Sequence, residues 1–267
     1  MKVWLVGVNT FRALRHNRAV LGLILFFLFV LLSTAGAIYF GNRLQRAGAA
    51  EQAELLFAQA IERLLGVNAV FCFLLAAVVG AYVLPSEIKS GTVVPTLGRA
   101  LSRRQFLLGL FLGLNLLLVA YLLLVSVAAA GLMLWGGVTP APTVLLGALY
   151  VVLVANIVAA LAFFFATLVS TVVALAAVFF FLQLRSMVEA IKLLSRLWGE
   201  RLERVFDYLL PAWSLLDYGS YLSLTREPLA RGAEFYLLGI GHAVTYGAVF
   251  LLLALVIFRR RSLLTPG

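Results

Sequence analysis

Residues 105–184 decide the fold: QFLLGLFLGLNLLLVAYLLLVSVAAAGLMLWGGVTPAPTVLLGALYVVLVANIVAALAFFFATLVSTVVALAAVFFFLQL. These 80 residues contain no Asp, Glu, Lys or Arg. A single helix of this length would measure about 120 Å, whereas the hydrocarbon core of a bilayer is roughly 30 Å thick. A Gly/Pro turn at Trp135–Thr143 and a weaker polar notch at 169–173 divide the segment. We therefore predict three membrane spans here, at 106–134, 143–168 and 171–185.

Three more segments lack acids and bases and each fits one transmembrane helix. They are 24, 23 and 24 residues long and cover 19–42, 64–86 and 235–258. The chain is 64% hydrophobic and 12% charged, whereas soluble domains carry about 25% charged residues. We predict one all-α, polytopic transmembrane domain with six spans, the other three at about 19–41, 65–85 and 235–258. Ala35 and Ala37 match a signal-peptidase pattern, but the apolar run is too long for a signal peptide, so we expect the first span to be retained.

The distribution of charge predicts cytoplasmic chain ends, because cytoplasmic loops attract Lys and Arg. The outer segments balance: 41–66 has three bases and three acids, and 185–234 has seven of each. The inner segments carry the whole net charge of +10, with eleven bases against Glu87 alone. This arrangement favours a multi-pass protein of the cell membrane, in a prokaryote the cytoplasmic membrane. The bases lie at the ends of apolar runs, so we exclude nucleic-acid binding. The inner bases are Lys2, Arg12, Arg15, Arg18, Lys89, Arg99, Arg103, Arg104, Arg259, Arg260 and Arg261.

Three amphipathic segments are predicted to lie on the membrane surface. The first, 1–18, is an N-terminal interfacial helix with Trp4, Val8 and Phe11 on its apolar face. The other two, 51–65 and 187–209, are outer amphipathic helices. The second of these belongs to an extracytoplasmic cap of residues 186–234 before the last span.

The spans offer few groups for chemistry. Apart from Arg185 at the end of the fifth span, they contain no Asp, Glu, Lys or Arg, and His242 is their one histidine. His242 suits either a proton relay or a hydrogen-bonded histidine near the membrane edge. Asn115 and Asn156 either line a pathway or bond a neighbouring helix. A single cysteine, Cys72, excludes an intrachain disulfide and a multi-cysteine metal site, so we predict no catalytic, metal or cofactor site.

No lysine completes the G-x-x-x-x-G-K-[ST] phosphate loop of nucleotide hydrolases. We therefore expect the chain not to be an enzyme. If it moves a substrate uphill, the energy must come from another polypeptide that contacts its long inner loop, 86–104. Pro85 is predicted to end the second span, Gly91 to permit a turn, and 92–101 to form a short helix along the membrane.

The inner loop resembles that of ABC-2-type permeases, the membrane subunits of ABC exporters. The likeness rests on Glu87-x-x-x-Gly91-Thr92, then Pro95-x-Leu97, then Leu101-Ser102-Arg103-x-x-Phe106-Leu107-Leu108-Gly109. Asn9-Thr10-Phe11-Arg12 with Arg15-x-Asn17-Arg18, and Leu210-Pro211-x-Trp213, are similar to other parts of the family. Ala100 and Leu110 stand where the family often has proline and lysine. The chain ends are also similar to those of copper-site maturation permeases, a likeness too generic to assign copper.

The resemblance implies a coupling helix in this loop that fits a groove of a separate ATPase, which binds the ATP. It also implies two permease subunits per complex, and Gly109-x-x-x-Gly113 and Ala155-x-x-x-Ala159 allow close helix approach either between subunits or within one chain. The alternatives are a membrane scaffold for a soluble assembly and a secondary carrier that uses His242. The residues expected to contact the ATPase are Glu87, Gly91, Thr92, Leu97, Arg99, Arg103 and Arg104.

Overall fold

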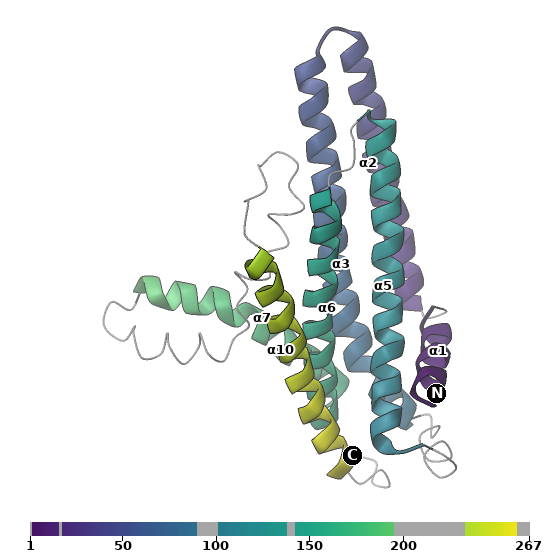
Figure 1. Ribbon diagram of the computed structural model, residues 1–267, viewed down its shortest axis with the longest axis vertical. Helices are drawn as coiled ribbons and strands as arrows, with labels where there is room; N and C mark the ends of the chain where they lie inside the picture. The colour runs from purple at the N-terminus through teal and green to yellow at the C-terminus, as the bar shows by residue number, and fades with distance from the viewer. Residues whose placement is uncertain (1, 16–17, 90–100, 138–141, 195–232, 261–267) are drawn as a thin grey trace.

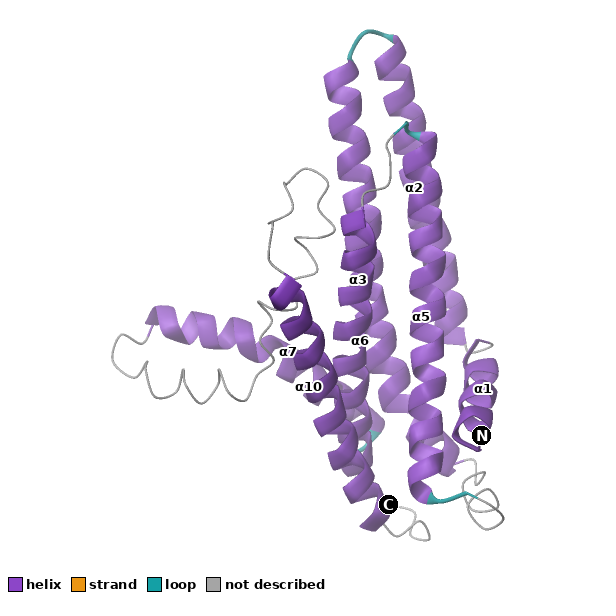
Figure 2. Cartoon of the chain, in the orientation of Figure 1, coloured by secondary structure: helices purple, strands orange, loops and turns teal. Residues whose placement is uncertain are grey.

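The computed structural model describes residues 2–15, 18–89, 101–137, 142–194 and 233–260. These residues form seven helices and short turns, without a strand among them, so the predicted all-helical class is confirmed (Figures 1 and 2). The helices are α1 (Lys2–Arg15), α2 (Arg18–Arg46), α3 (Ala50–Lys89), α5 (Arg103–Trp135), α6 (Pro142–Leu168), α7 (Thr171–Leu194) and α10 (Ala233–Arg260).

Five of these helices, α2, α3, α5, α6 and α10, are long and apolar enough to cross a membrane. This is the character of a multi-pass membrane protein. Helix α6 ends at Leu168, and α7 begins at Thr171. The apolar part of α7, Thr171–Gln183, is shorter than the other five. The helix itself continues to Leu194, into residues expected to begin the outer cap.

Helices α3 and α6 form the centre of the bundle. Helix α3 packs against α2, α5, α6 and α7, while α6 packs against α3, α5, α7 and α10. Leu64, Cys72 and Leu84 of α3 and Phe163 of α6 are fully buried. A Cβ atom on Gly80 would lie 2.9 Å from the Cβ of Ala162, so the two backbones approach closely.

The predicted surface helix at 51–65 is instead the beginning of α3, which runs unbroken over 40 residues. At 1.5 Å per residue this helix is about 60 Å long, roughly twice the hydrocarbon thickness. Its first turns pack against α2 through Phe57, whose nearest ring atom would lie only 2.5 Å from a Cβ on Gly41. Figure 1 shows the α2–α3 hairpin extending beyond the other helices. Residues 51–65 bury their apolar side against α2, which explains why they do not form a separate helix on the membrane surface.

Pro85 was expected to end the second span, but the helix does not end there, because α3 continues through it to Lys89. A proline inside a helix leaves one carbonyl without its usual N–H donor. A side-chain hydrogen bond stabilises the helix next to Pro85: the Ser86 hydroxyl donates a 2.8 Å bond to the carbonyl of Val83.

Helix α1 packs along the first half of α5 through Gly7 and Thr10, and these two residues and Leu14 are the buried ones of α1. Trp4, assigned to the apolar face, is 55% exposed. The surface that α1 buries is thus centred on small residues, which a count of large apolar side chains does not reveal. The glycines of α5 that face α1 are Gly109 and Gly113.

Candidate functional site

The candidate site is the end of the bundle from which the inner loop leaves. Helix α3 ends there at Lys89, and α5 begins there at Arg103. Glu87 is half-buried in the last turn of α3, Arg103 is half-buried, and Arg104 is exposed. Four residues expected to contact an ATPase lie outside the described residues: Gly91, Thr92, Leu97 and Arg99.

A capping box fixes the start of α5. The Ser102 hydroxyl accepts a 3.2 Å hydrogen bond from the backbone N–H of Gln105, and the Gln105 side chain accepts a 3.1 Å bond from the N–H of Ser102. This arrangement satisfies N–H groups that the first turn of a helix otherwise leaves unpaired. The Ser-x-x-Gln spacing at 102–105 was visible in the sequence. The loop therefore ends at a sharply defined helix start.

Arg103 joins this helix start to the other end of the chain. Its guanidinium donates hydrogen bonds of 3.4 Å and 3.0 Å to the main-chain oxygens of Phe258 and Arg259. These carbonyls belong to the last turn of α10, whose unpaired C=O groups and negative dipole end favour a cation. The first turn of α5 is therefore bonded directly to the last turn of α10.

A basic groove lies beside this contact. It has a volume of about 700 Å³ and is lined by Arg104 of α5 together with residues near the end of α10. The α10 lining residues are Leu252, Leu255, Val256, Arg259 and Arg260. We call it the α5–α10 groove. It combines three guanidinium groups with an apolar wall.

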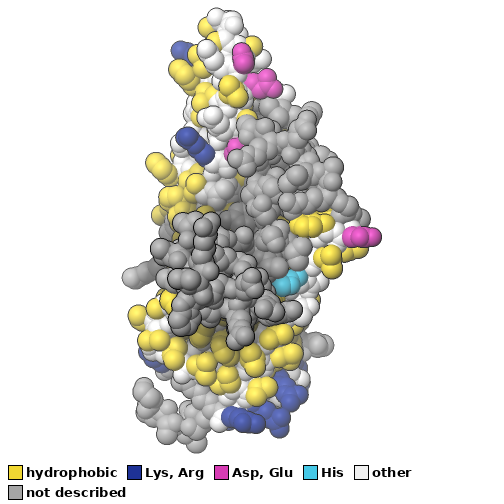
Figure 3. Space-filling model, turned by 90° about the vertical axis from the view of Figure 1, so that its left-hand side faces the viewer, with side chains coloured by type: hydrophobic (Ala, Val, Ile, Leu, Met, Phe, Trp, Pro, Cys, Tyr) yellow, Lys and Arg dark blue, Asp and Glu magenta, His cyan; other side chains and the backbone are white. Residues whose placement is uncertain are grey.

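One end of the molecule carries an excess of basic side chains, whereas residues 41–66 at the other end hold three bases and three acids. On the face drawn in Figure 3, described Lys and Arg side chains gather at the end of the bundle where α10 terminates, and a hydrophobic belt lies above them. Acidic side chains appear on this face only farther up, and Glu51 and Glu54 belong to the far end of α3. One pole is therefore suited to an anionic surface or partner.

The two asparagines expected in the spans each bond their own helix. Asn115 donates a 2.9 Å hydrogen bond to the carbonyl of Phe111, and Asn156 donates a 3.2 Å bond to that of Val152. Both side chains are half-buried. These bonds anchor the amides locally, and neither bond joins two helices.

His242 lies half-buried in α10 with its ring 4.8 Å from that of Tyr246. The two residues are four positions apart and so share one side of the helix. Phe250 extends the same row, with its ring 6.0 Å from that of Tyr246. His242 thus belongs to an aromatic row along α10.

A buried polar pair, not predicted from the sequence, joins α3 and α5. The Tyr121 hydroxyl donates a 2.6 Å hydrogen bond to the amide oxygen of Asn68, whose side chain is fully buried. The Asn68 amide nitrogen donates to the carbonyl of Leu64 at 2.7 Å. An asparagine within the charge-free segment 64–86 was the signal that could have found this pair.

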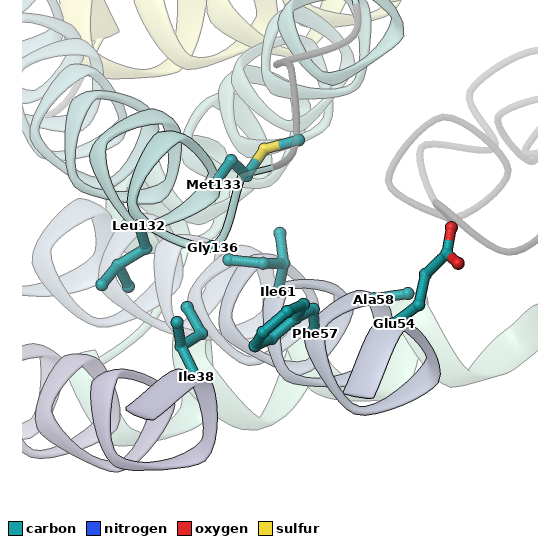
Figure 4. Close-up of a pocket in the computed structure, with 8 residues that line it drawn as sticks. All are labelled: Ile38, Glu54, Phe57, Ala58, Ile61, Leu132, Met133 and Gly136. Atoms are coloured by element: carbon teal, nitrogen blue, oxygen red, sulfur yellow. The ribbon is translucent and has the colours of Figure 1, made fainter. Parts of the chain in front are cut away.

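A small cavity lies near the opposite end, between α2, α3 and α5 (Figure 4). Its volume is about 110 Å³, and its lining is apolar except for Glu54. Figure 4 shows the Glu54 carboxylate directed away from Phe57 and Ile61, toward the outside. The cavity therefore presents an apolar lining without a polar group aimed into it.

The two small-residue pairs, Gly109/Gly113 and Ala155/Ala159, are used within the chain. A Cβ on Gly109 would lie 2.5 Å from the Cβ of Val6, and α1 covers both glycines. Ala155 and Ala159 are completely buried in α6. These pairs therefore provide close packing between helices of one chain.

Protein-family models give no match to this chain, and a search of curated proteins finds no similar sequence. The resemblance to ABC-2-type permeases thus rests on the loop motif itself.

Proposed function

We propose that this chain is the permease subunit of an ABC-2-type exporter, which couples ATP hydrolysis by a separate subunit to movement of a substrate across the membrane. The observation that carries the proposal is the inner-loop motif, in which Glu87 lies in the last turn of a central helix and Arg103 begins another. Because the spans lack acids and bases apart from Arg185 at the end of the fifth, and the chain has no phosphate loop, uphill movement of a substrate would require an external source of energy.

The proposed topology has six spans with both termini in the cytoplasm, and α7 is the fifth span in chain order. The pole that contains Arg104, Arg259 and Arg260 then faces the cytoplasm, in agreement with the positive-inside rule. The inner loop lies at this same pole, between Lys89 and Arg103. A partner ATPase would contact the loop there, and a second permease subunit would complete the complex.

Contacts of the two helices that flank the loop support the proposed coupling role. Helix α3 lies at the centre of the bundle, so a push on its loop end reaches α6, while α5 reaches α10 through Arg103. Coupling of this kind requires packed elements rather than a continuous path of charged groups. The two helices that flank the loop therefore suit a part that receives mechanical force.

The test begins with purification of the tagged chain from native membranes and measurement of ATP hydrolysis by the recovered complex. We expect a nucleotide-binding subunit to copurify. The double variant Arg103→Glu/Arg104→Glu should lower ATP turnover in the complex, whereas the matched pair Arg43→Glu/Arg46→Glu at the other pole should leave it unchanged. Recovery of no nucleotide-binding subunit would refute the proposal. If a partner copurifies but its ATP turnover is the same with the Arg103→Glu/Arg104→Glu variant as with wild type, the chain acts as a scaffold.

A further inference from the structure

We propose that the α5–α10 groove binds an anionic phospholipid, with the phosphate at its arginines and the first part of an acyl chain along its apolar wall. The groove contains Arg104, Arg259 and Arg260 and, among the described residues, no acid lines it. Basic pockets between membrane helices on the cytoplasmic side are suited to anionic headgroups. The apolar wall of the groove provides a surface for the hydrophobic part of such a ligand.

Charged and apolar residues follow one another along the groove in the same order as the headgroup and acyl chain of a phospholipid. Leu252 precedes Arg259 by seven residues in α10, so it lies about 10 Å farther along the helix axis. Leu252 and Val256 are 59% and 54% exposed, and both face the groove. The headgroup level is therefore cationic, and the level about 10 Å beyond it is apolar.

The fold concentrates the positive charge at this point. Hydrogen bonds from Arg103 to the last carbonyls of α10 hold the first turn of α5 beside the last turn of α10. Arg104, the next residue, is consequently kept near Arg259 and Arg260 in one groove. Like charges at short distance repel, and an anion between them relieves that repulsion.

A phospholipid fits these features better than a free anion. Inorganic phosphate would use the three arginines, but it would leave Leu252, Leu255 and Val256 without a role. A lipid uses both parts, because burial of its methylene groups against the apolar wall adds to its binding. The inference does not require the proposed transport function, since lipid binding needs neither ATP nor a partner subunit.

The full chain, purified in detergent, is mixed with equal amounts of phosphatidylglycerol and phosphatidylcholine, and retained lipids are counted by native mass spectrometry. We expect wild type to retain phosphatidylglycerol preferentially. The variant Arg104→Gln/Arg259→Gln/Arg260→Gln should lose this preference by at least about tenfold, from the energy that each basic residue contributes near an anionic lipid. The control Arg43→Gln/Arg46→Gln/Arg63→Gln removes the same charge elsewhere and should behave as wild type. Equal retention by the groove variant and wild type would overturn the proposal.

Two further arms separate lipid from simple anion binding. Val256→Trp keeps every charge but places a larger side chain in the groove. The acyl chain then has less room, so retention of phosphatidylglycerol should fall. Millimolar inorganic phosphate should displace little of the lipid from wild type. Full displacement by phosphate would show an anion site without lipid character, and unchanged retention by Val256→Trp would exclude the acyl-chain contact. Both arms decide the question even if the triple groove variant fails to fold.

Discussion

Tyr121 of α5 donates a 2.6 Å hydrogen bond to the side-chain oxygen of Asn68 in α3, inside the bundle. The ring of Phe27 in α2 meets the Tyr121 ring edge-on, with 6.2 Å between centroids. Three helices therefore meet at one phenol. A hydrogen bond has a direction and a fixed length, so this contact sets the register of α3 and α5 more strictly than apolar packing alone.

Removal of the Tyr121 hydroxyl should destabilise the fold. Tyr121→Phe leaves the Asn68 oxygen buried without its donor, and we expect a loss of about 1 kcal/mol in the free energy of unfolding. Unfolding in mixed micelles, followed by circular dichroism, measures this change. Tyr82→Phe, at an exposed position on α3, is the matched control. The double variant Asn68→Leu/Tyr121→Phe should recover part of the loss because no polar group then stays unpaired. An unaffected Tyr121→Phe protein would show that the bond contributes nothing to stability.

Two glycines of α5 allow a comparison in which the expected effects have opposite signs. A Cβ on Gly113 would lie 2.6 Å from the Cβ of Thr10 and 2.7 Å from the carbonyl oxygen of Gly7, so alanine there must displace α1. At Gly131 nothing lies within 4 Å. Gly131→Ala should stabilise the helix by about 0.5–1 kcal/mol. Gly113→Ala should destabilise the protein by about 1–3 kcal/mol.

Limited proteolysis of α1 provides the second measurement for this pair. Gly113→Ala should expose the α1 segment to protease, while Gly131→Ala should leave its protection as in wild type. If both alanines stabilise the protein equally, α1 does not pack on Gly113 as described.

The long helices were predictable from the sequence because absence of charge over at least 23 residues leaves few alternatives to a membrane helix. Their ends were less predictable. Charged Glu62 and Arg63 suggested that the second span begins after them, yet α3 starts at Ala50. The end of a charge-free segment shows how much of a helix can lie in lipid. The helix itself can continue beyond that point. Phe57, which packs against Gly41 of α2, belongs to the part of α3 that precedes Glu62.

Contacts between helices were beyond the reach of sequence patterns. The Gly109/Gly113 pair indicates close approach, but it cannot specify whether α1 or another chain occupies it. In the same way, Arg103 was expected to contact a partner because of its motif, whereas its bonds to the end of α10 join residues 155 and 156 positions apart. Only the three-dimensional arrangement shows that one side chain links the loop to the last helix.

The Arg103 contact predicts a change in helix separation. Arg103→Ala removes both hydrogen bonds to the end of α10, so the ends of α5 and α10 should move apart or become more heterogeneous. Spin labels on exposed positions near the two ends would report this as a broader distance distribution in pulsed electron paramagnetic resonance. Arg104→Ala removes a neighbouring charge and leaves both bonds in place, so it serves as the control. Identical distributions for the two variants would contradict the role assigned to Arg103.

The orientation of α3 is testable because its two ends lie about 60 Å apart. Cys72 is the one cysteine of the chain and is completely buried, so new thiols can be labelled against a low background. The proposed topology places the turn before α3 outside the cell and Lys89 in the cytoplasm. Ala47→Cys should therefore react with a membrane-impermeant maleimide in intact cells, while Lys89→Cys should react only after permeabilisation. Both positions are exposed, so burial does not account for a difference between them. Labelling of Lys89→Cys from the outside would place the inner loop beyond the reach of a cytoplasmic ATPase and overturn the proposed function.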